Sequence, residues 1–181
     1  MIRLGSNSPT RAKILKEHNI DFIQNGGSFN EDSITTTNPK SFVYQATLGK
    51  YNELIKKYGC KDMPLLVADS VVTSNGELLR KAKDEKDARR MLELQSGNKT
   101  SVITCMIFKS KTKELIDISI TTYEFREFDE DDIENYIKSG ECFGKAGAIM
   151  VEGFCRPYIK SVVGYESTAM GLCVEKLKVY I

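Results

Sequence analysis

Apolar residues fall in short runs along the chain, and the form of each run indicates the element that it builds. The run 65–73 is almost continuously apolar, which is typical of a strand buried on both faces. Ile116, Ile118 and Ile120 instead alternate with polar residues, which is typical of a half-buried strand. Asn75-Gly76 is a strong signal for a tight hairpin turn. Strands are predicted over the following ranges: 1–4, 65–73, 78–79, 101–108, 116–120, 148–151 and 158–163.

Helices are predicted where apolar residues recur every three or four positions behind a capping residue. Ser8 caps a helix that begins at Pro9, because the missing N–H of proline costs nothing at the first helical position. Asp84 and Asp129 are the predicted caps of two later helices. The predicted helices are these: from Pro9 onward, with Ala12, Ile14 and Leu15 as its apolar face; 41–58, interrupted at Gly49 and ending at Gly59; 84–94, stopping at Gly97; and Asp129 to Gly140, with Ile133, Tyr136 and Ile137 inward.

The order of these elements indicates the fold class. Strands and helices are mixed rather than strictly alternating, so we expect an α/β fold in which helices flank a mixed sheet. A chain of 181 residues suffices for one sizeable domain, or for one domain with two lobes around a cleft. No repeat, linker or low-complexity stretch divides the sequence, so residues 1–181 are predicted to form a single domain.

Composition and charge argue against several classes of protein. The 26 lysines and arginines balance 25 acidic residues, and a net charge of +1 does not suit a general nucleic-acid binder. No apolar run is long enough to span a membrane, and Arg3 interrupts the N-terminus, so neither a membrane anchor nor a signal peptide is expected. The five scattered cysteines fit reduced thiols in the cytoplasm. His18 is the only histidine, which argues against a histidine metal site or a Ser-His-Asp triad.

The stretch 4–15, "LGSNSPTRAKIL", predicts a strand, a loop of small residues and a helix. Such a helix start directs several unpaired backbone N–H groups at one point, at the positive end of the helix dipole. Ser6, Ser8, Arg11 and Lys13 surround that point, so the stretch is a candidate anion or phosphate site. The alternative is ordinary helix capping, which is the favoured interpretation on this segment alone.

Asp69 is the most informative polar residue, because it lies within the apolar run 65–73. A carboxylate in such a strand is costly to desolvate unless it is paired, binds a ligand or faces a cleft. The structural alternative is that Asp69 lies at a bulge or strand end and caps a neighbouring backbone group. The functional interpretation is favoured over this alternative.

Other charged residues are candidates only in combination. Lys50, Lys81 and Lys145 are each ordinary surface lysines by default, although the glycines near Lys145 indicate a backbone that closely approaches another group. Glu31 and Asp32 are either plain loop acids or ligands of Mg²⁺, a cation that needs only one or two carboxylates besides substrate phosphates. None of these residues is decisive alone.

Taken together, in order and spacing, these segments resemble the Maf proteins, nucleoside triphosphate pyrophosphatases of the inosine triphosphatase-like superfamily. "LGSNSPTRAKIL" is similar to the opening signature of that family, and "VADSVVTSNGELLRKAKDEKDARRMLELQSGNKTSVIT" is similar to its central block. "DDIENYIKSGECFGKAGAIMVEG" and "VVGYESTAMGLCVEKL" resemble its third block and its closing segment. The resemblance spans nearly the whole chain, and it implies a mixed twisted sheet flanked by helices, with two lobes around a central cleft.

The chain departs from the family pattern at several positions. Thr10 stands where the first of two arginines is usual, Ala82 replaces a proline, and Ser101 stands where a histidine is common. Ser70 resembles the branch that acts on dTTP and UTP, whereas Glu152 resembles the branch that acts on methylated guanine nucleotides. The resemblance therefore leaves the preferred base open.

The resemblance implies hydrolysis of the α–β phosphoanhydride of a nucleoside triphosphate, which gives a nucleoside monophosphate and pyrophosphate, with Mg²⁺ or Mn²⁺ as the cofactor. Asp69 would either accept a proton from the attacking water or bind the metal, and this division stays open. The implied roles are catalytic for Asp69, Lys81 and Lys50, substrate-binding for Ser6, Ser8, Arg11, Ser70, Lys145 and Glu152, and metal-binding for Glu31 and Asp69. Beyond its substrate, the expected partner is a second copy of the chain, because superfamily precedent favours a homodimer.

A protein-interaction module would show an exposed apolar surface rather than converging charges, and no stretch of the sequence demands one. Two other functions remain open at the level of sequence. A non-catalytic nucleotide-sensing protein linked to cell-division arrest would keep the phosphate loop but would not need Asp69 and the lysines. A phosphatase that removes the terminal phosphate would release orthophosphate directly. The joint presence of Asp69 and the lysines favours the pyrophosphatase.

Overall fold

Three long strands, β3, β5 and β6, form the centre of a seven-stranded sheet in the order β2-β1-β3-β5-β6-β7, with β4 beside β3. This computed structural model describes residues 1–181. β1 pairs in parallel with β2 and β3, and every other pair is antiparallel, so the mixed sheet is confirmed. The strands are β1 (Ile2–Leu4), β2 (Phe22–Gln24), β3 (Leu65–Ser74), β4 (Glu77–Leu79), β5 (Lys99–Lys109), β6 (Glu114–Phe125) and β7 (Ile159–Val163).

Helices begin where the capping residues predicted them. The side chains of Ser8, Asp84 and Asp129 each accept a hydrogen bond from a backbone N–H in the first turn of the helix that follows. None of the helices has the length and apolar character needed to cross a membrane. The helices are α1 (Pro9–Glu17), α2 (Pro39–Tyr58), α3 (Glu85–Gln95), α4 (Glu130–Ser139), α5 (Glu166–Ala169) and α6 (Val174–Leu177), with 3-10 turns η1 (Glu31–Ser33) and η2 (Arg156–Tyr158).

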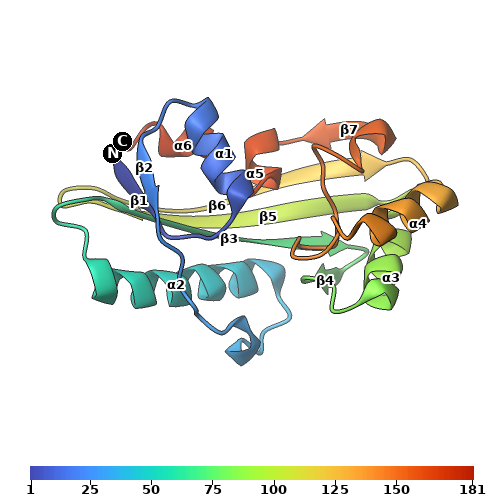
Figure 1. Cartoon of the computed structure of the whole chain (residues 1–181), viewed down its shortest axis with the longest axis horizontal. Coiled ribbons are helices and arrows are strands. Elements are labelled where there is room, and N and C mark those ends of the chain that lie inside the picture. Colours follow the sequence, from blue (N-terminus) through green and yellow to red (C-terminus); the bar gives the residue numbers. More distant parts are fainter.

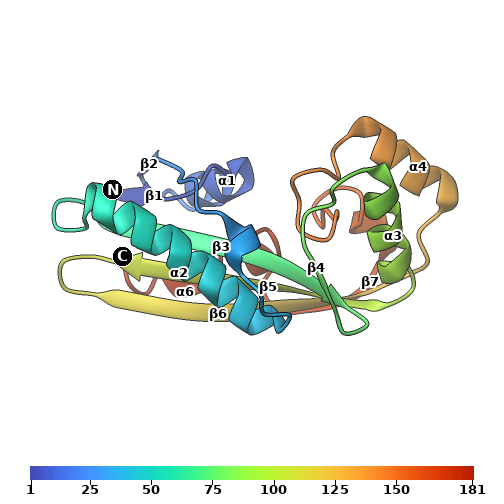
Figure 2. The same cartoon turned by 90° about the horizontal axis from the view of Figure 1, so that it is seen from below.

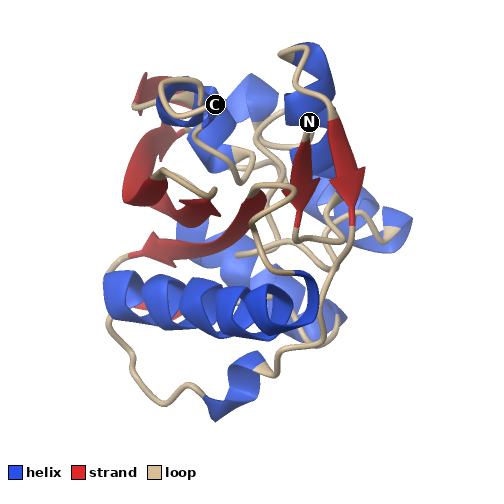
Figure 3. Ribbon diagram, turned by 90° about the vertical axis from the view of Figure 1, so that its left-hand side faces the viewer, coloured by secondary structure: helices blue, strands red, loops and turns tan.

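The two faces of the sheet are covered by different helices. α2 packs Phe42, Val43 and Ala46 against Val71 of β3 and Ile103 of β5. α1 and the C-terminal segment pack on the opposite face, in a second apolar cluster. Figure 3 shows this layering end-on, with the long helix α2 below the strands and both chain termini in the upper half of the view. Figure 1 shows the same arrangement from the side.

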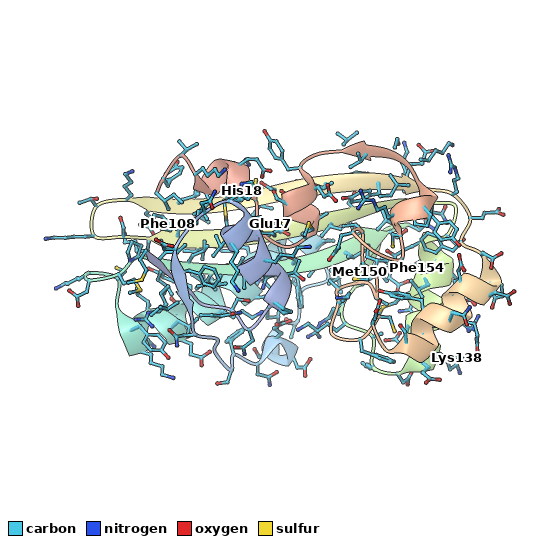
Figure 4. All side chains as sticks on the ribbon, turned by 45° about the horizontal axis from the view of Figure 1, so that its top comes forward. Glu17, His18, Phe108, Lys138, Met150 and Phe154 are labelled. Carbon is cyan, nitrogen blue, oxygen red and sulfur yellow. The ribbon has the colours of Figure 1, made fainter.

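The long strands continue beyond this layered part and carry a second lobe. Figure 2 shows β3, β5 and β6 passing beneath both ends of the molecule, with α1 and α2 at one end and α3 and α4 at the other. Each end has its own apolar cluster. Figure 4 places Met150 and Phe154 in the α3–α4 lobe and Phe108 at the opposite end. The predicted two-lobed α/β fold is therefore confirmed.

One edge of β3 is only partly paired, and this opens the sheet between the lobes. β5 pairs with β3 along its full length, Leu65–Ser74. On the other side, β1 pairs only with Leu65 and Leu66, and β4 pairs only with Val72 and the residues after it. Residues 67–71 therefore have no strand partner on that side, and a cleft forms there.

The predicted interruption of the second helix at Gly49 is wrong. α2 runs without a break from Pro39 to Tyr58 and ends at Gly59, as predicted. Gly49 is needed instead because the ring of Phe29 lies against the helix: a Cβ on Gly49 would come within 2.2 Å of Phe29 Cζ. The glycine serves a tertiary contact rather than a break in the helix.

The predicted strand at 148–151 is also wrong. Ala148 has a φ of +57°, and the chain turns repeatedly through this segment, joining the sheet only through an isolated bridge between Lys81 and Ala146. A positive φ is incompatible with an extended strand. The short strand β2, in contrast, carries no strong signal and was not predicted.

The alternating isoleucines do lie in a strand, β6, but they occupy its more exposed face. Ile116, Ile118 and Ile120 are 50%, 36% and 39% exposed. Ser119 and Thr121, which flank Ile120, are buried. α2 covers β3 and β5 on this face of the sheet and stops short of β6. The alternation is real, but the polar residues face the interior, where Thr121 Oγ1 donates to the carbonyl of Tyr165 at 2.6 Å and Ser119 Oγ donates to Asp117 Oδ2 at 2.5 Å.

Candidate active site

A cleft of about 660 Å³ lies at the unpaired edge of β3, between the two lobes. Its walls come from the loop after β1, the segment before η1, the middle of α2 and β3, and the turns around 143–152 and 169–171. The residues with an implied catalytic, substrate-binding or metal-binding role all line it: Ser6, Ser8, Arg11, Glu31, Lys50, Asp69, Ser70, Lys81, Lys145 and Glu152. The prediction that Lys13 belongs to the anion site is wrong, because its side chain is 60% exposed outside the cleft and pairs with Glu17. Asp32, the other candidate acid, lies outside the cleft, where it pairs with Arg80 at 3.0 Å.

The loop after β1 forms one wall of this cleft. It leaves the carboxyl end of a parallel strand, the edge at which α/β sheets bind ligands. Ser6 Oγ accepts a hydrogen bond from the N–H of Ser8, and Ser8 Oγ accepts one from the N–H of Arg11. Gly5 lets the loop cross the sheet closely, since a Cβ there would lie 2.6 Å from Leu54 Cδ1. The loop is therefore held in place by its own hydroxyls and by a close backbone approach.

Arg11 connects this loop to two distant parts of the chain. Its Nη1 donates to Ser6 Oγ at 3.0 Å, its Nη2 donates to Ser70 Oγ at 3.2 Å, and its Nε donates to the carbonyl of Gly171 at 2.7 Å. Burial lowers the pKa of Arg11, and the charges of Asp69 and Glu31 oppose that shift. A guanidinium carries five N–H donors, so two remain for a ligand. Arg11 both fixes the walls of the cleft and retains limited capacity to bind an anion.

Lys50 and two carboxylates form the most highly charged part of the cleft. Lys50 Nζ lies 2.6 Å from Glu31 Oε1 and 2.9 Å from Asp69 Oδ1. Asp69 is only 6% exposed, and its second oxygen, Oδ2, is buried without a hydrogen-bond partner. Burial alone would raise the pKa of Glu31, but the hydrogen bond and charge of Lys50, with the charges of Lys81 and Arg80, outweigh it and lower this pKa. Glu31 is therefore held as an anion, and both carboxylates contact the same ammonium group.

The strand geometry explains why Asp69 meets Lys50. Side chains alternate between the two faces of a strand, so Asp69 shares a face with Val71, which packs against α2. Ser70 points to the other face, where its hydroxyl lies 2.8 Å from Thr104 Oγ1. Because this edge of β3 is open, both residues still reach the cleft.

Lys81 and Lys145 stand on the opposite lobe and form no ion pair within the chain. Their segments are joined by an antiparallel bridge between Lys81 and Ala146 and by a hydrogen bond from the N–H of Gly147 to the carbonyl of Arg80. Gly147 has a φ of +62° and packs directly on Val72: a Cβ on Gly147 would lie only 2.8 Å from Val72 Cβ. The predicted close backbone approach near Lys145 is thus present.

Part of the cleft wall was not predicted from the sequence. Apolar residues line part of the cleft, namely Val102, Ile149, Val151 and Met170, together with Phe143, which is 38% exposed. In a sequence, such side chains are indistinguishable from core residues. Only their placement around the cleft shows that they are available to an apolar or aromatic part of a ligand.

The carboxylates fit a hard divalent cation. Carboxylate oxygens are preferred ligands of Mg²⁺, and the buried Asp69 Oδ2 has no partner within the chain. No cluster of three or more His, Cys, Asp or Glu residues is present, so the chain alone offers too few ligands for a closed metal site. Glu31 and Asp69 therefore suit a cation whose remaining ligands come from a substrate and water.

Comparisons with known proteins agree with this geometry. The model of a family described as Maf-like protein matches residues 1–181. A protein named nucleoside triphosphate pyrophosphatase from Nitratiruptor sp. is 53% identical over 179 residues, which are 98% of this chain and 96% of that relative. Proteins of the same name are 41% identical in Helicobacter pylori, over 96% of this chain and 91% of the relative, and 36% identical in Campylobacter jejuni, over 100% of both chains.

Proposed function

The chain belongs to the Maf-like protein family, and we propose from this premise that it hydrolyses the α–β phosphoanhydride of nucleoside triphosphates. It is a hydrolase of the nucleoside triphosphate pyrophosphatase class. The observation that carries the proposal is the pair of carboxylates on one wall of the cleft, facing the unpaired ammonium groups of Lys81 and Lys145 on the other. A ligand that carries both negative charge and a hydrolysable bond suits this arrangement.

The triphosphate would bind between the loop after β1 and the two lysines. Backbone N–H groups at the start of α1, with the remaining N–H groups of Arg11, can donate to phosphate oxygens. Lys81 and Lys145 supply positive charge that needs no rearrangement of partners, because neither is ion-paired within the chain. Such charges stabilise the negative charge that develops on the leaving pyrophosphate.

Asp69 is the group placed to activate water. Its Oδ1 is bound by Lys50, whereas its Oδ2 has no partner and is free to accept a proton. In this mechanism the water oxygen bonds to phosphorus, the α–β phosphoanhydride breaks, pyrophosphate leaves, and the proton passes to Asp69. A general base of this kind contributes about 10²- to 10⁴-fold in rate.

Glu31 and Asp69 would hold Mg²⁺ or Mn²⁺ together with the substrate phosphates. When bound, such a cation neutralises the charge of the phosphate oxygens. Lys50 holds both carboxylates close to each other in the absence of the cation. In the nucleotide-free protein Lys50 is therefore a positioning group, which holds the two carboxylates through its two ion pairs.

The base would lie in the apolar part of the cleft, with Glu152 and Phe143 at its side. Two further proposals concern the whole protein. A cytoplasmic location is supported by five cysteines without a disulfide. A homodimer of this single domain, residues 1–181, is supported by the exposed apolar row Ile116, Ile118 and Ile120 on β6.

The proposal is tested by measuring pyrophosphate and orthophosphate separately, with Mg²⁺, across canonical and modified nucleoside triphosphates. We expect pyrophosphate from one class of substrate, and a loss of at least about 100-fold in Asp69→Asn, because the amide cannot accept the proton. Asp117→Asn is the matched control: Asp117 is 13% exposed and pairs with Lys176 at 2.5 Å, but it lies outside the cleft. This control should keep its activity.

The outcomes separate the three candidate functions. Orthophosphate as the first product would make the protein a phosphatase. Nucleotide binding without any product would place it among nucleotide-sensing proteins. Full activity in a folded Asp69→Asn variant would remove Asp69 from the mechanism while leaving the reaction class intact.

A further inference from the structure

Lys50 occupies the space between the two carboxylates that suit a divalent cation. Its Nζ contacts Glu31 Oε1 at 2.6 Å and Asp69 Oδ1 at 2.9 Å, and it has no other hydrogen-bond acceptor. The side chain is 19% exposed and lines the cleft. The ammonium group therefore binds the two carboxylate oxygens for which a metal ion would compete.

Arg11, the other cation close to Asp69, does not compete in this way. Its donors bind the hydroxyls of Ser6 and Ser70 and the carbonyl of Gly171, all of them neutral acceptors. Arg80 likewise pairs with Asp32, outside the cleft. Lys50 is thus the cation that offsets the negative charge of Glu31 and Asp69 directly, because it is ion-paired with both.

The charge at this point changes with the position of Lys50. With the ammonium in place, the cluster of Lys50, Glu31 and Asp69 carries one net negative formal charge, and a hard divalent cation gains little by replacing the ammonium. With the ammonium drawn away, the two carboxylates that line the cleft have no cationic partner between them, and Asp69 Oδ2 already has no hydrogen-bond partner. A lysine has a flexible stem of four carbons, so its ammonium can reach other anions in the cleft.

We propose that Lys50 holds the place of the divalent cation in the nucleotide-free protein, and that the cation binds together with the triphosphate that draws Lys50 off the carboxylates. This inference rests on the proposed function, because it takes a phosphate chain as the competing anion. It makes metal and nucleotide binding interdependent. Neither ligand then assembles the site alone, which limits hydrolysis to the complete complex.

The test measures Mn²⁺ binding to the nucleotide-free protein by the loss of the free-ion electron paramagnetic resonance signal. We expect wild type to bind Mn²⁺ weakly, and Lys50→Met and Lys50→Gln to bind it at least about ten-fold more tightly, since the competing charge is gone. Lys50→Arg keeps the charge and should bind as weakly as wild type. The double variant Lys50→Met with Glu31→Gln should lose the gain, which locates the ion at these carboxylates.

The inference is overturned if both neutral variants bind Mn²⁺ no more tightly than wild type. A second measurement needs no variant: wild-type crystals with Mn²⁺ and a non-hydrolysable triphosphate should show the anomalous signal of Mn²⁺ beside Asp69 and Lys50 Nζ away from Glu31. Mn²⁺ beside Asp69 with both ion pairs of Lys50 intact would contradict it. Pyrophosphate release is measured separately, so a failed function and a failed role for Lys50 are distinguishable.

Discussion

At the scale of single residues, the cleft depends on how its buried charges are balanced. Asp69 lies within a buried strand, where an isolated carboxylate would be costly. Lys50 offsets this cost on one oxygen, and the other oxygen is left without a partner. Glu31 binds the same ammonium group from the turn η1. The reactive carboxylate and its positioning charge therefore form a single ionic cluster.

We expect the stability of the protein to fall in acid partly through Glu31. Its pKa is lowered in the folded state, so its contribution is present above the unfolded pKa of about 4.3 and is lost as the pH falls through the folded value. Glu31→Gln should lower the free energy of unfolding by roughly 1 kcal/mol near neutral pH, and should flatten its decline below about pH 4.3. Urea denaturation over a pH series measures both effects.

Glu17 provides the control for this series. It is exposed on α1 (Figure 4) and pairs with Lys13 at 3.7 Å. Glu17→Gln should change the free energy of unfolding by less than about 0.5 kcal/mol at any pH in the series. An acid decline in Glu31→Gln as steep as that of wild type would show that Glu31 does not carry this dependence.

At the scale of elements, α2 shows how a helix meets the loop that carries Glu31. Phe29 lies on Gly49, and Glu53, one turn further along the helix, accepts hydrogen bonds from Ser28 at 2.9 and 3.1 Å. The loop is thus fixed to α2 at two successive turns. This attachment places Glu31 next to Lys50 on the same helix.

Gly49→Ala should destabilise the protein, although alanine is the better helix former by about 1 kcal/mol. The new Cβ would lie 2.2 Å from Phe29 Cζ, so the ring must leave the helix, and we expect a net loss of about 1 kcal/mol in the free energy of unfolding. In a Phe29→Ala background the same substitution should stabilise by about 1 kcal/mol. Urea denaturation of the four proteins gives the coupling, and equal effects in both backgrounds would contradict this account.

At the scale of the whole molecule, hydrogen bonds around Arg11 join segments that are distant in the sequence. Arg11 reaches Ser70 on β3 and Gly171 in the C-terminal segment. Ser70 in turn bonds Thr104 on β5, and Thr104 Oγ1 donates to the carbonyl of Thr168 at 2.7 Å. The start, the centre and the end of the chain therefore meet behind the cleft.

Arg11→Lys should be markedly destabilising although it keeps the charge. Lysine lacks the planar fork that reaches three acceptors in different directions, and we expect a loss of about 2–3 kcal/mol in the free energy of unfolding. Lys13→Met is the control, since Lys13 is 60% exposed on the outer side of the same helix and should change little. Thermal or urea denaturation measures both, and an Arg11→Lys protein as stable as wild type would assign Arg11 to substrate binding alone.

The features that could be predicted from the sequence alone depend on chemistry between residues close together in the chain. Caps at Ser8, Asp84 and Asp129, and the hairpin at Asn75-Gly76, where both residues have positive φ, depend on contacts within a few residues. A carboxylate inside the apolar run 65–73 is costly unless it has a partner or faces a cleft, and this expectation for Asp69 depends only on its neighbours in the sequence. Local patterns therefore predicted the principal elements, the mixed fold and the unusual position of Asp69, whereas the full set of cleft residues was implied by the family resemblance.

Other features depend on contacts between residues that are distant in the sequence, and these are seen only in the tertiary structure. Gly49 looks like a helix breaker until Phe29 is placed beside it, and the apolar run 148–151 looks like a strand until its turn is seen beside β3. In the same way, no sequence pattern indicates that Lys50 lies between Glu31 and Asp69. These features arise from packing between segments far apart in the chain, and packing of that kind leaves no local pattern in the sequence.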